Sequence, residues 1–138
     1  MAITYVAVAI AALASFVLGM LWYGPLFGKI WMKLSGITNK QVKVAKKKNM
    51  SPAYVASILG SVVMAFVLGL FITLTGVTSA AGGMMIGAWA WLGFIAPVQL
   101  GKVLWEGKPL QLYALDVAFH LVALLLMGYI LVWAPAVL

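Results

Sequence analysis

The hydrophobic positions of this chain fall into four long runs, separated by segments of different polarity. A helix needs about 20 mostly apolar residues to cross a bilayer, so each run is long enough for one transmembrane span. The runs cover about residues 2–23, 52–75, 80–103 and 110–133. Each is followed by a glycine or proline that favours a helix end, namely Pro25, Gly76, Gly107 and Pro135. The pattern predicts an all-α, integral membrane four-helix bundle, with residues 1–138 as one domain.

Composition supports lipid as the solvent of this protein. Of the 138 residues, 66% are hydrophobic and 8% are charged, whereas soluble domains carry about 25% charged residues. There is no cysteine, which excludes disulfides, thiolate metal sites and cysteine nucleophiles. There is also no arginine, the usual reader of phosphates and guanine edges. We therefore expect no nucleic-acid partner, and the single histidine gives no reason to expect a metal, a cofactor or a catalytic site.

The lysines predict the orientation of the spans. All nine lie in the first and third connecting segments, at Lys29, Lys33, Lys40, Lys43, Lys46, Lys47, Lys48, Lys102 and Lys108. With four spans these two segments fall on one side, and the positive-inside rule places them in the cytoplasm with both termini outside. The first run lacks a basic leader and exceeds a typical signal-peptide core, so we expect it to be retained.

The basic loop, residues 24–51, has two parts. Residues 26–35 alternate apolar side chains with Lys29 and Lys33, which suits a short helix lying on the bilayer surface. Residues 40–48 hold five lysines that would be attracted to anionic lipid headgroups. The cluster is equally explained as a solvated topology signal, and a partner-docking role is the alternative.

Small residues recur every fourth position along the first three spans. Such ridges let helix backbones approach closely, and packing contacts drive helix association in lipid. The ridges predict helix contacts at Ala7, Ala11, Ser15, Gly19, Ser57, Ser61, Ala65, Gly69, Gly83 and Gly87. Ordinary packing within one chain and a homo-oligomer interface both remain open.

The second and fourth spans align without a gap. Ser57 then matches Asp116 and Ser61 matches His120, while the first and third spans share a looser pattern. The chain therefore fits two parallel, repeated helical hairpins. Chance alignment of small residues in apolar helices is the alternative.

Asp116 and His120 are, tyrosines aside, the ionisable residues placed deep in a span. They are four residues apart and so share one helix face. Ser57 and Ser61 reach matching depths on the second span, which predicts an intramembrane polar layer of these four residues. We expect Asp116 and His120 to face the bundle interior and to be coupled. The layer would either fasten helices together or serve a proton or ion pathway.

The segment after the first span resembles the signature of a family of small bacterial membrane proteins, the domain of unknown function 1761. The resemblance covers the whole chain and includes the stretch 91–93 and the fourth span around His120. Its most specific residues are Trp22, Tyr23, Gly24, Pro25, Gly28, Lys29 and Trp31. The resemblance implies four spans and a bacterial inner membrane location, but no activity.

Two functions follow as expectations. The first is a non-enzymatic, multi-pass membrane protein that acts by association, as a homo-oligomer or within a larger complex. The second is a small oligomeric transporter or channel that uses the layer of Asp116 and His120.

Overall fold

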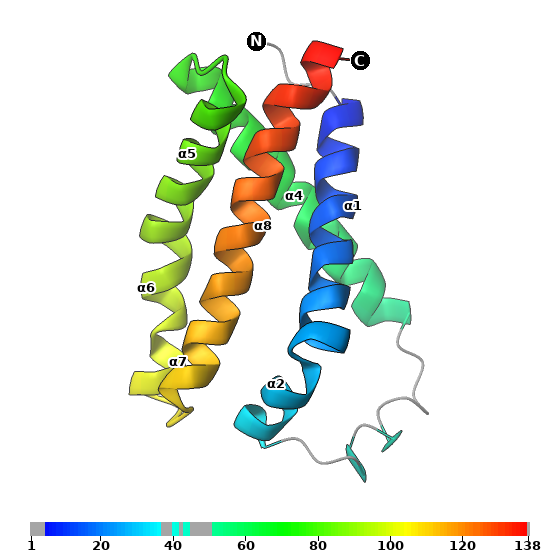
Figure 1. Ribbon diagram of the computed structural model, residues 1–138, viewed down its shortest axis with the longest axis vertical. Coiled ribbons are helices and arrows are strands. Elements are labelled where there is room, and N and C mark those ends of the chain that lie inside the picture. The colour runs from blue at the N-terminus through cyan, green and yellow to red at the C-terminus, as the bar shows by residue number, and fades with distance from the viewer. Residues whose placement is uncertain (1–4, 37–39, 42, 45–50, 138) are drawn as a thin grey trace.

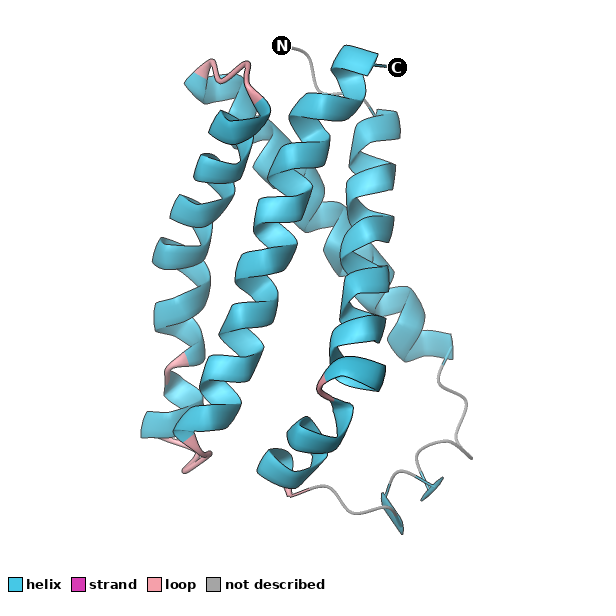
Figure 2. Ribbon diagram, in the orientation of Figure 1, coloured by secondary structure: helices cyan, strands magenta, loops and turns pink. Residues whose placement is uncertain are grey.

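The computed structural model describes residues 5–36, 40, 41, 43, 44 and 51–137, with the backbone alone for 136 and 137. Its labelled elements are helical (Figures 1 and 2). In chain order they are α1 (Tyr5–Leu21), η1 (Trp22–Leu26), α2 (Gly28–Ser35), α4 (Ser51–Thr75), α5 (Ala80–Ala90), η2 (Trp91–Ile95), α6 (Ala96–Gln99), α7 (Gly101–Leu104) and α8 (Leu110–Val137). Three of the five lysines of the expected headgroup-binding cluster, Lys46, Lys47 and Lys48, lie outside the described residues.

The prediction of an all-α membrane protein with four spans is confirmed. The structure has helices long and apolar enough to cross a membrane at Tyr5–Leu26, Ser51–Thr75, Ala80–Leu104 and Leu110–Pro135. The first continues past the expected end at Tyr23, because Pro25 lies inside the π-helical turn η1 and does not stop the helix. A π-helical turn changes the local hydrogen-bond spacing, which lets the chain accommodate a proline without an N–H.

The four spans are packed in the order α4, α1, α8, α5. The most extensive contact joins α5 to α8, followed by α1 to α8 and α1 to α4. Figure 1 shows α4 crossing diagonally behind α1 and α8, so that its first half stands apart from the bundle. Both termini lie at one end, and α2 and the turn between α7 and α8 lie at the other (Figure 1).

The bundle is tight at the end that holds the termini. Small residues dominate the contacts there: a Cβ added to Gly83 or Gly87 of α5 would fall on backbone carbonyls of α8, and one added to Gly128 would fall on the carbonyl of Gly83. Ala7 and Ala11 of α1 are fully buried in the same half. Because backbones touch at this end, the α5–α8 contact depends on glycine.

The opposite end of the bundle is wider. Aromatic residues occupy it, including Phe16, Tyr23, Tyr54 and Phe119. All four rings line one cavity, which lies between α1, α4 and α8. The groups of functional interest gather at this wide end.

The two hairpins share one feature and differ in another. Each odd-numbered span contains a five-residue π-helical turn that begins with tryptophan and has glycine third, at Trp22–Leu26 and Trp91–Ile95. The packing is unequal, however, because α1 lies along α8 whereas α4 barely touches α5. The duplicated hairpin therefore stays a prediction.

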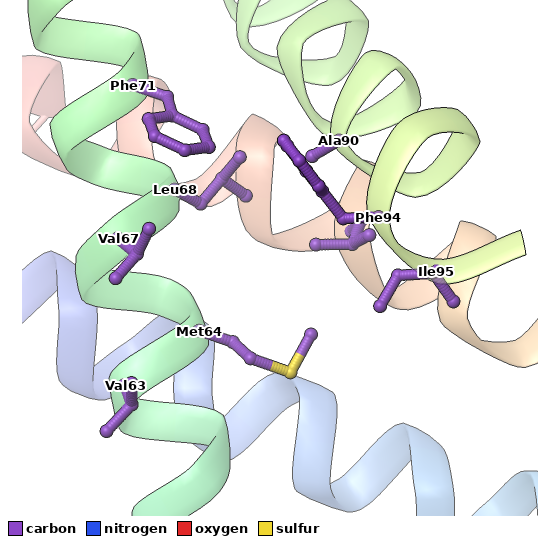
Figure 3. A pocket seen from close by; sticks show the side chains of 9 residues that line it. Val63, Met64, Val67, Leu68, Phe71, Ala90, Phe94 and Ile95 are labelled. Carbon is purple, nitrogen blue, oxygen red and sulfur yellow. The ribbon is translucent and has the colours of Figure 1, made fainter. Parts of the chain in front are cut away.

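An apolar cavity fills the gap between α4 and the third span. It has a volume of about 380 Å³. Figure 3 shows Met64, Leu68 and Phe71 of α4 on one side, facing Phe94 and Ile95 of η2 on the other. Its lining is hydrophobic throughout, so lipid tails suit it.

Candidate functional site

The signature segment folds back on itself through η1 and α2. Gly28 allows this close approach, because a Cβ there would lie 2.7 Å from the carbonyl oxygen of Tyr23. Trp31 of α2 then packs edge-on against Tyr23, with ring centroids 5.7 Å apart. Trp22 packs against Phe27 at 4.7 Å. These contacts fix the direction in which Tyr23 points.

Tyr23 points at Asp116, which is the centre of the site. The Tyr23 hydroxyl donates a hydrogen bond of 2.7 Å to Oδ1 of Asp116. The ammonium group of Lys102 lies 3.2 Å from Oδ2. Asp116 itself is 6% exposed. The carboxylate on α8 is therefore held by one group from η1 and one from α7, and it joins three of the four spans.

Two further hydrogen bonds fasten the third span to α8. The indole N–H of Trp91 donates to the carbonyl oxygen of Val117 at 2.7 Å. The hydroxyl of Tyr113 donates to the carbonyl oxygen of Ala96 at 2.8 Å. The indole of Trp91 extends from the first residue of η2. The carbonyl of Ala96 lies directly after η2, where a break in α-helical regularity frees backbone groups to take other partners. Together with Asp116 the two bonds form a polar seam between η2, α7 and α8.

His120 lies apart from this seam. It borders a second cavity, of about 550 Å³, that opens between α1, α4 and α8. Ser15, Ser57 and Ser61 line the same cavity. Among the described residues no hydrogen bond joins Asp116 to His120. The structure thus gathers three members of the expected polar layer, with Ser15, whereas Asp116 is not among the residues that line this cavity.

The expected packing residues occupy different environments. Ala7, Ala11, Ser15, Ala65, Gly69, Gly83 and Gly87 are buried. Gly19 and Ser61 are half-buried, whereas Ser57 is exposed. The second half of the α4 ridge therefore packs against other helices of the same chain, while the first half of the ridge stays exposed.

The other signature residues divide between support and surface. Trp22 is half-buried beside Phe119, at a centroid distance of 6.1 Å. Gly24, Pro25 and Lys29 are exposed. The signature thus builds the support that orients Tyr23.

Sequence reasoning missed the two partners of Asp116. In the sequence, Lys102 enters only the topology prediction and Tyr23 only the family signature. A signal for Lys102 was present, since Lys102 and Asp116 each lie seven residues from Pro109 in the turn. Equal distances from the turn of a helical hairpin place two side chains at similar depth. No comparable signal links Tyr23 to Asp116, because they are 93 residues apart.

Comparison with known proteins gives a family and no more. The family model described as Protein of unknown function (DUF1761) matches residues 6–132. No curated protein matches the chain at a significant level. No solved structure does so either.

Proposed function

Because the chain belongs to the DUF1761 family, whose description names no activity, we propose a function from geometry: a non-enzymatic, multi-pass membrane protein that acts by association, with a second copy or within a larger membrane complex. The observation that carries the proposal is the state of Asp116. Both of its oxygens are engaged, by Tyr23 and by Lys102. A carboxylate paired in this way fastens helices together, which supports a structural role for Asp116.

Association is supported by the uncovered half of α4. Four small residues near its start are exposed, namely Ala53, Ala56, Ser57 and Gly60. A Cβ added to Gly60 meets nothing within 4 Å. Small residues four apart are typical of close helix contacts in membranes. A helix of a second copy can approach α4 closely over these small residues, whereas the neighbouring valine and leucine side chains would hold it farther away.

We place the protein in the bacterial inner membrane, with the lysine loops in the cytoplasm and both termini outside. The described lysines support this orientation, since Lys29, Lys33, Lys102 and Lys108 belong to the end opposite the termini. Lys40 and Lys43 are exposed, which suits contact with anionic headgroups.

Cysteine cross-linking tests the association, since the chain has no cysteine of its own. In native membranes an Ala56→Cys variant should form a disulfide-linked dimer, because that bond requires Cβ atoms about 4 Å apart. The matched control is Val98→Cys on the third span, where the side chain is 73% exposed. Equal cross-linking at both positions would mean random collision. Absent cross-linking, with a monomer as the sole species in detergent, would refute self-association.

A small oligomeric transporter or channel is the second candidate, and the cavity beside His120 is the observation that favours it. Reconstituted protein can be assayed for proton and cation flux through liposomes. Flux in the parent that is lost in Asp116→Asn would favour transport. Equal absence of flux in both would favour association.

A further inference from the structure

The cavity beside His120 differs from the apolar cavity in its chemistry. The polar residues that line it are three serines, Tyr54 and His120. Within the described part of the chain, these groups have no hydrogen-bond partner, whereas Asp116 nearby has two. Ser15 is buried, and Ser61 and His120 are half-buried. Polar groups at such positions in a membrane protein are costly unless they are satisfied. A ligand with hydrogen-bonding atoms would satisfy them.

The wall also limits the charge of such a ligand. None of the residues that line the cavity is a lysine, aspartate or glutamate. The nearest carboxylate and ammonium are paired with each other. An ionised headgroup would therefore be buried without a counter-charge, which is expensive at this depth. The ligand that fits is uncharged.

Aromatic rings make up much of the remaining wall. Phe16 and Tyr54 meet edge-on at 6.4 Å, and Tyr23 meets Phe119 at 5.3 Å. Rings arranged in this way favour a flat, aromatic or conjugated head. The volume of about 550 Å³ lies within the usual range of small-molecule sites, about 300–1,000 Å³.

The cavity is reached from the side, through the bilayer. Its edge on α4 carries Tyr54, which is 54% exposed, and Ser57, which is also exposed. Gly60, at the same edge, leaves room around its backbone. A head with a hydrocarbon tail could enter here and leave its tail among the lipids.

We propose that this cavity binds an uncharged, ring-bearing amphiphile of the quinone type, whose carbonyl oxygens accept hydrogen bonds from His120 and the serine hydroxyls. The inference does not rest on self-association, because the groups that define it face inward from α1 and α8 as well as from α4. Tyr23 lines this cavity, and its hydroxyl donates a hydrogen bond to Asp116. A bound ring would therefore lie next to the polar seam that joins the spans.

Binding of decylubiquinone to the protein in lipid nanodiscs tests the proposal, followed through quenching of tryptophan fluorescence. His120→Phe keeps a ring and removes the donor, so binding should weaken about three- to tenfold, the value of one hydrogen bond. His120→Gln keeps a donor and should bind within about twofold of the parent. Since lipid partition is common to all samples, differences between variants report the site.

Steric variants give an independent reading. Ser61→Phe should fill the cavity and abolish binding, whereas Val67→Phe, in the apolar cavity, should leave it unchanged. If Ser61→Phe does not fold, Ser57→Phe at the exposed edge fills the cavity instead, and dimer formation is measured in parallel because Ser57 also belongs to the small-residue surface of α4. Ala56→Leu should reduce dimers without changing quinone binding, which separates this proposal from self-association.

Several results would overturn the proposal. They are no binding to the parent, equal binding to His120→Phe, and equal or tighter binding of decylbenzene or decanoate. The first would mean that the cavity takes no quinone, and binding of decylbenzene would indicate a merely hydrophobic site. Tighter binding of decanoate would contradict the requirement for an uncharged head.

Discussion

Replacing Lys102 with methionine is expected to destabilise the protein more than replacing Asp116 with leucine. The two changes break the same ion pair, but they leave different groups behind. The side chain of Asp116 is 9% exposed, whereas that of Lys102 is 37% exposed. Loss of Lys102 leaves the buried carboxylate of Asp116 without its counter-charge, and this short side chain cannot extend to the lipid headgroups. Loss of Asp116 frees a long side chain that can extend to the membrane surface.

The structure sets the size of this asymmetry. Stranding one partner of a buried ion pair costs about 3–5 kcal/mol, and partial exposure of Lys102 favours the lower end, about 3 kcal/mol. Asp116→Leu removes the acceptor of the Tyr23 hydroxyl, worth about 1–2 kcal/mol, and removes the charge from the span. The double variant should therefore cost about as much as Asp116→Leu alone, because the two sites are coupled.

Unfolding in mixed micelles with increasing SDS, followed by the fluorescence of the six tryptophans, measures these differences. Lys108→Met is the matched control, since Lys108 is exposed and should change stability by less than about 0.5 kcal/mol. Three results would refute the reasoning: a small effect of Lys102→Met, a larger effect of Asp116→Leu, or additive losses in the double variant.

Three other predictions use the same cysteine-free chain. Single cysteines at Lys40 and Ser79 should label from opposite sides of the membrane; labelling of both from outside intact cells would contradict the topology. Gly83→Leu should lower the unfolding free energy by about 1–3 kcal/mol or prevent folding, because it overpacks the contact between α5 and α8. In the same denaturation assay Gly93→Leu, where an added Cβ meets nothing within 4 Å, should change little, and equal effects would reject a specific contact. Trp91→Phe should cost about 1 kcal/mol through the lost bond to the backbone of α8; no measurable loss would mean that this bond contributes nothing.

The positions of the spans could be read from the sequence because they depend on residues that are contiguous. Twenty apolar residues require a membrane whatever their neighbours are. Two of the four expected ends followed in the same way: Gly76 and Gly107 both have positive φ, at 73° and 67°, which glycine adopts without strain. The ends expected at Pro25 and Pro135 were wrong, because both prolines lie inside a helical segment. Ser79 caps α5 by accepting a hydrogen bond from the N–H of Gly82 at 3.0 Å.

The ridges of small residues were a weaker guide. They identified Gly83 and Gly87, whose contacts with α8 require glycine. They gave no reason why Ala65 should be buried and Ser57 exposed on one ridge. That difference arises because α4 crosses the bundle at an angle and leaves it at one end (Figure 1).

Only the tertiary structure decided how the polar groups are distributed. Helices that are apolar on every side carry little information about which face turns inward, so the rotation of each span and the order of the spans around the bundle are set by packing. That packing brings Tyr23 and Lys102, from two other spans, to the carboxylate of Asp116. It leaves His120 with the serines in a separate cavity. The sequence determined that charged groups within the spans would need partners, because hydrocarbon does not solvate them. Which partners they found depended on how the helices are rotated and packed at the end of the bundle that holds Tyr23, Lys102 and Asp116.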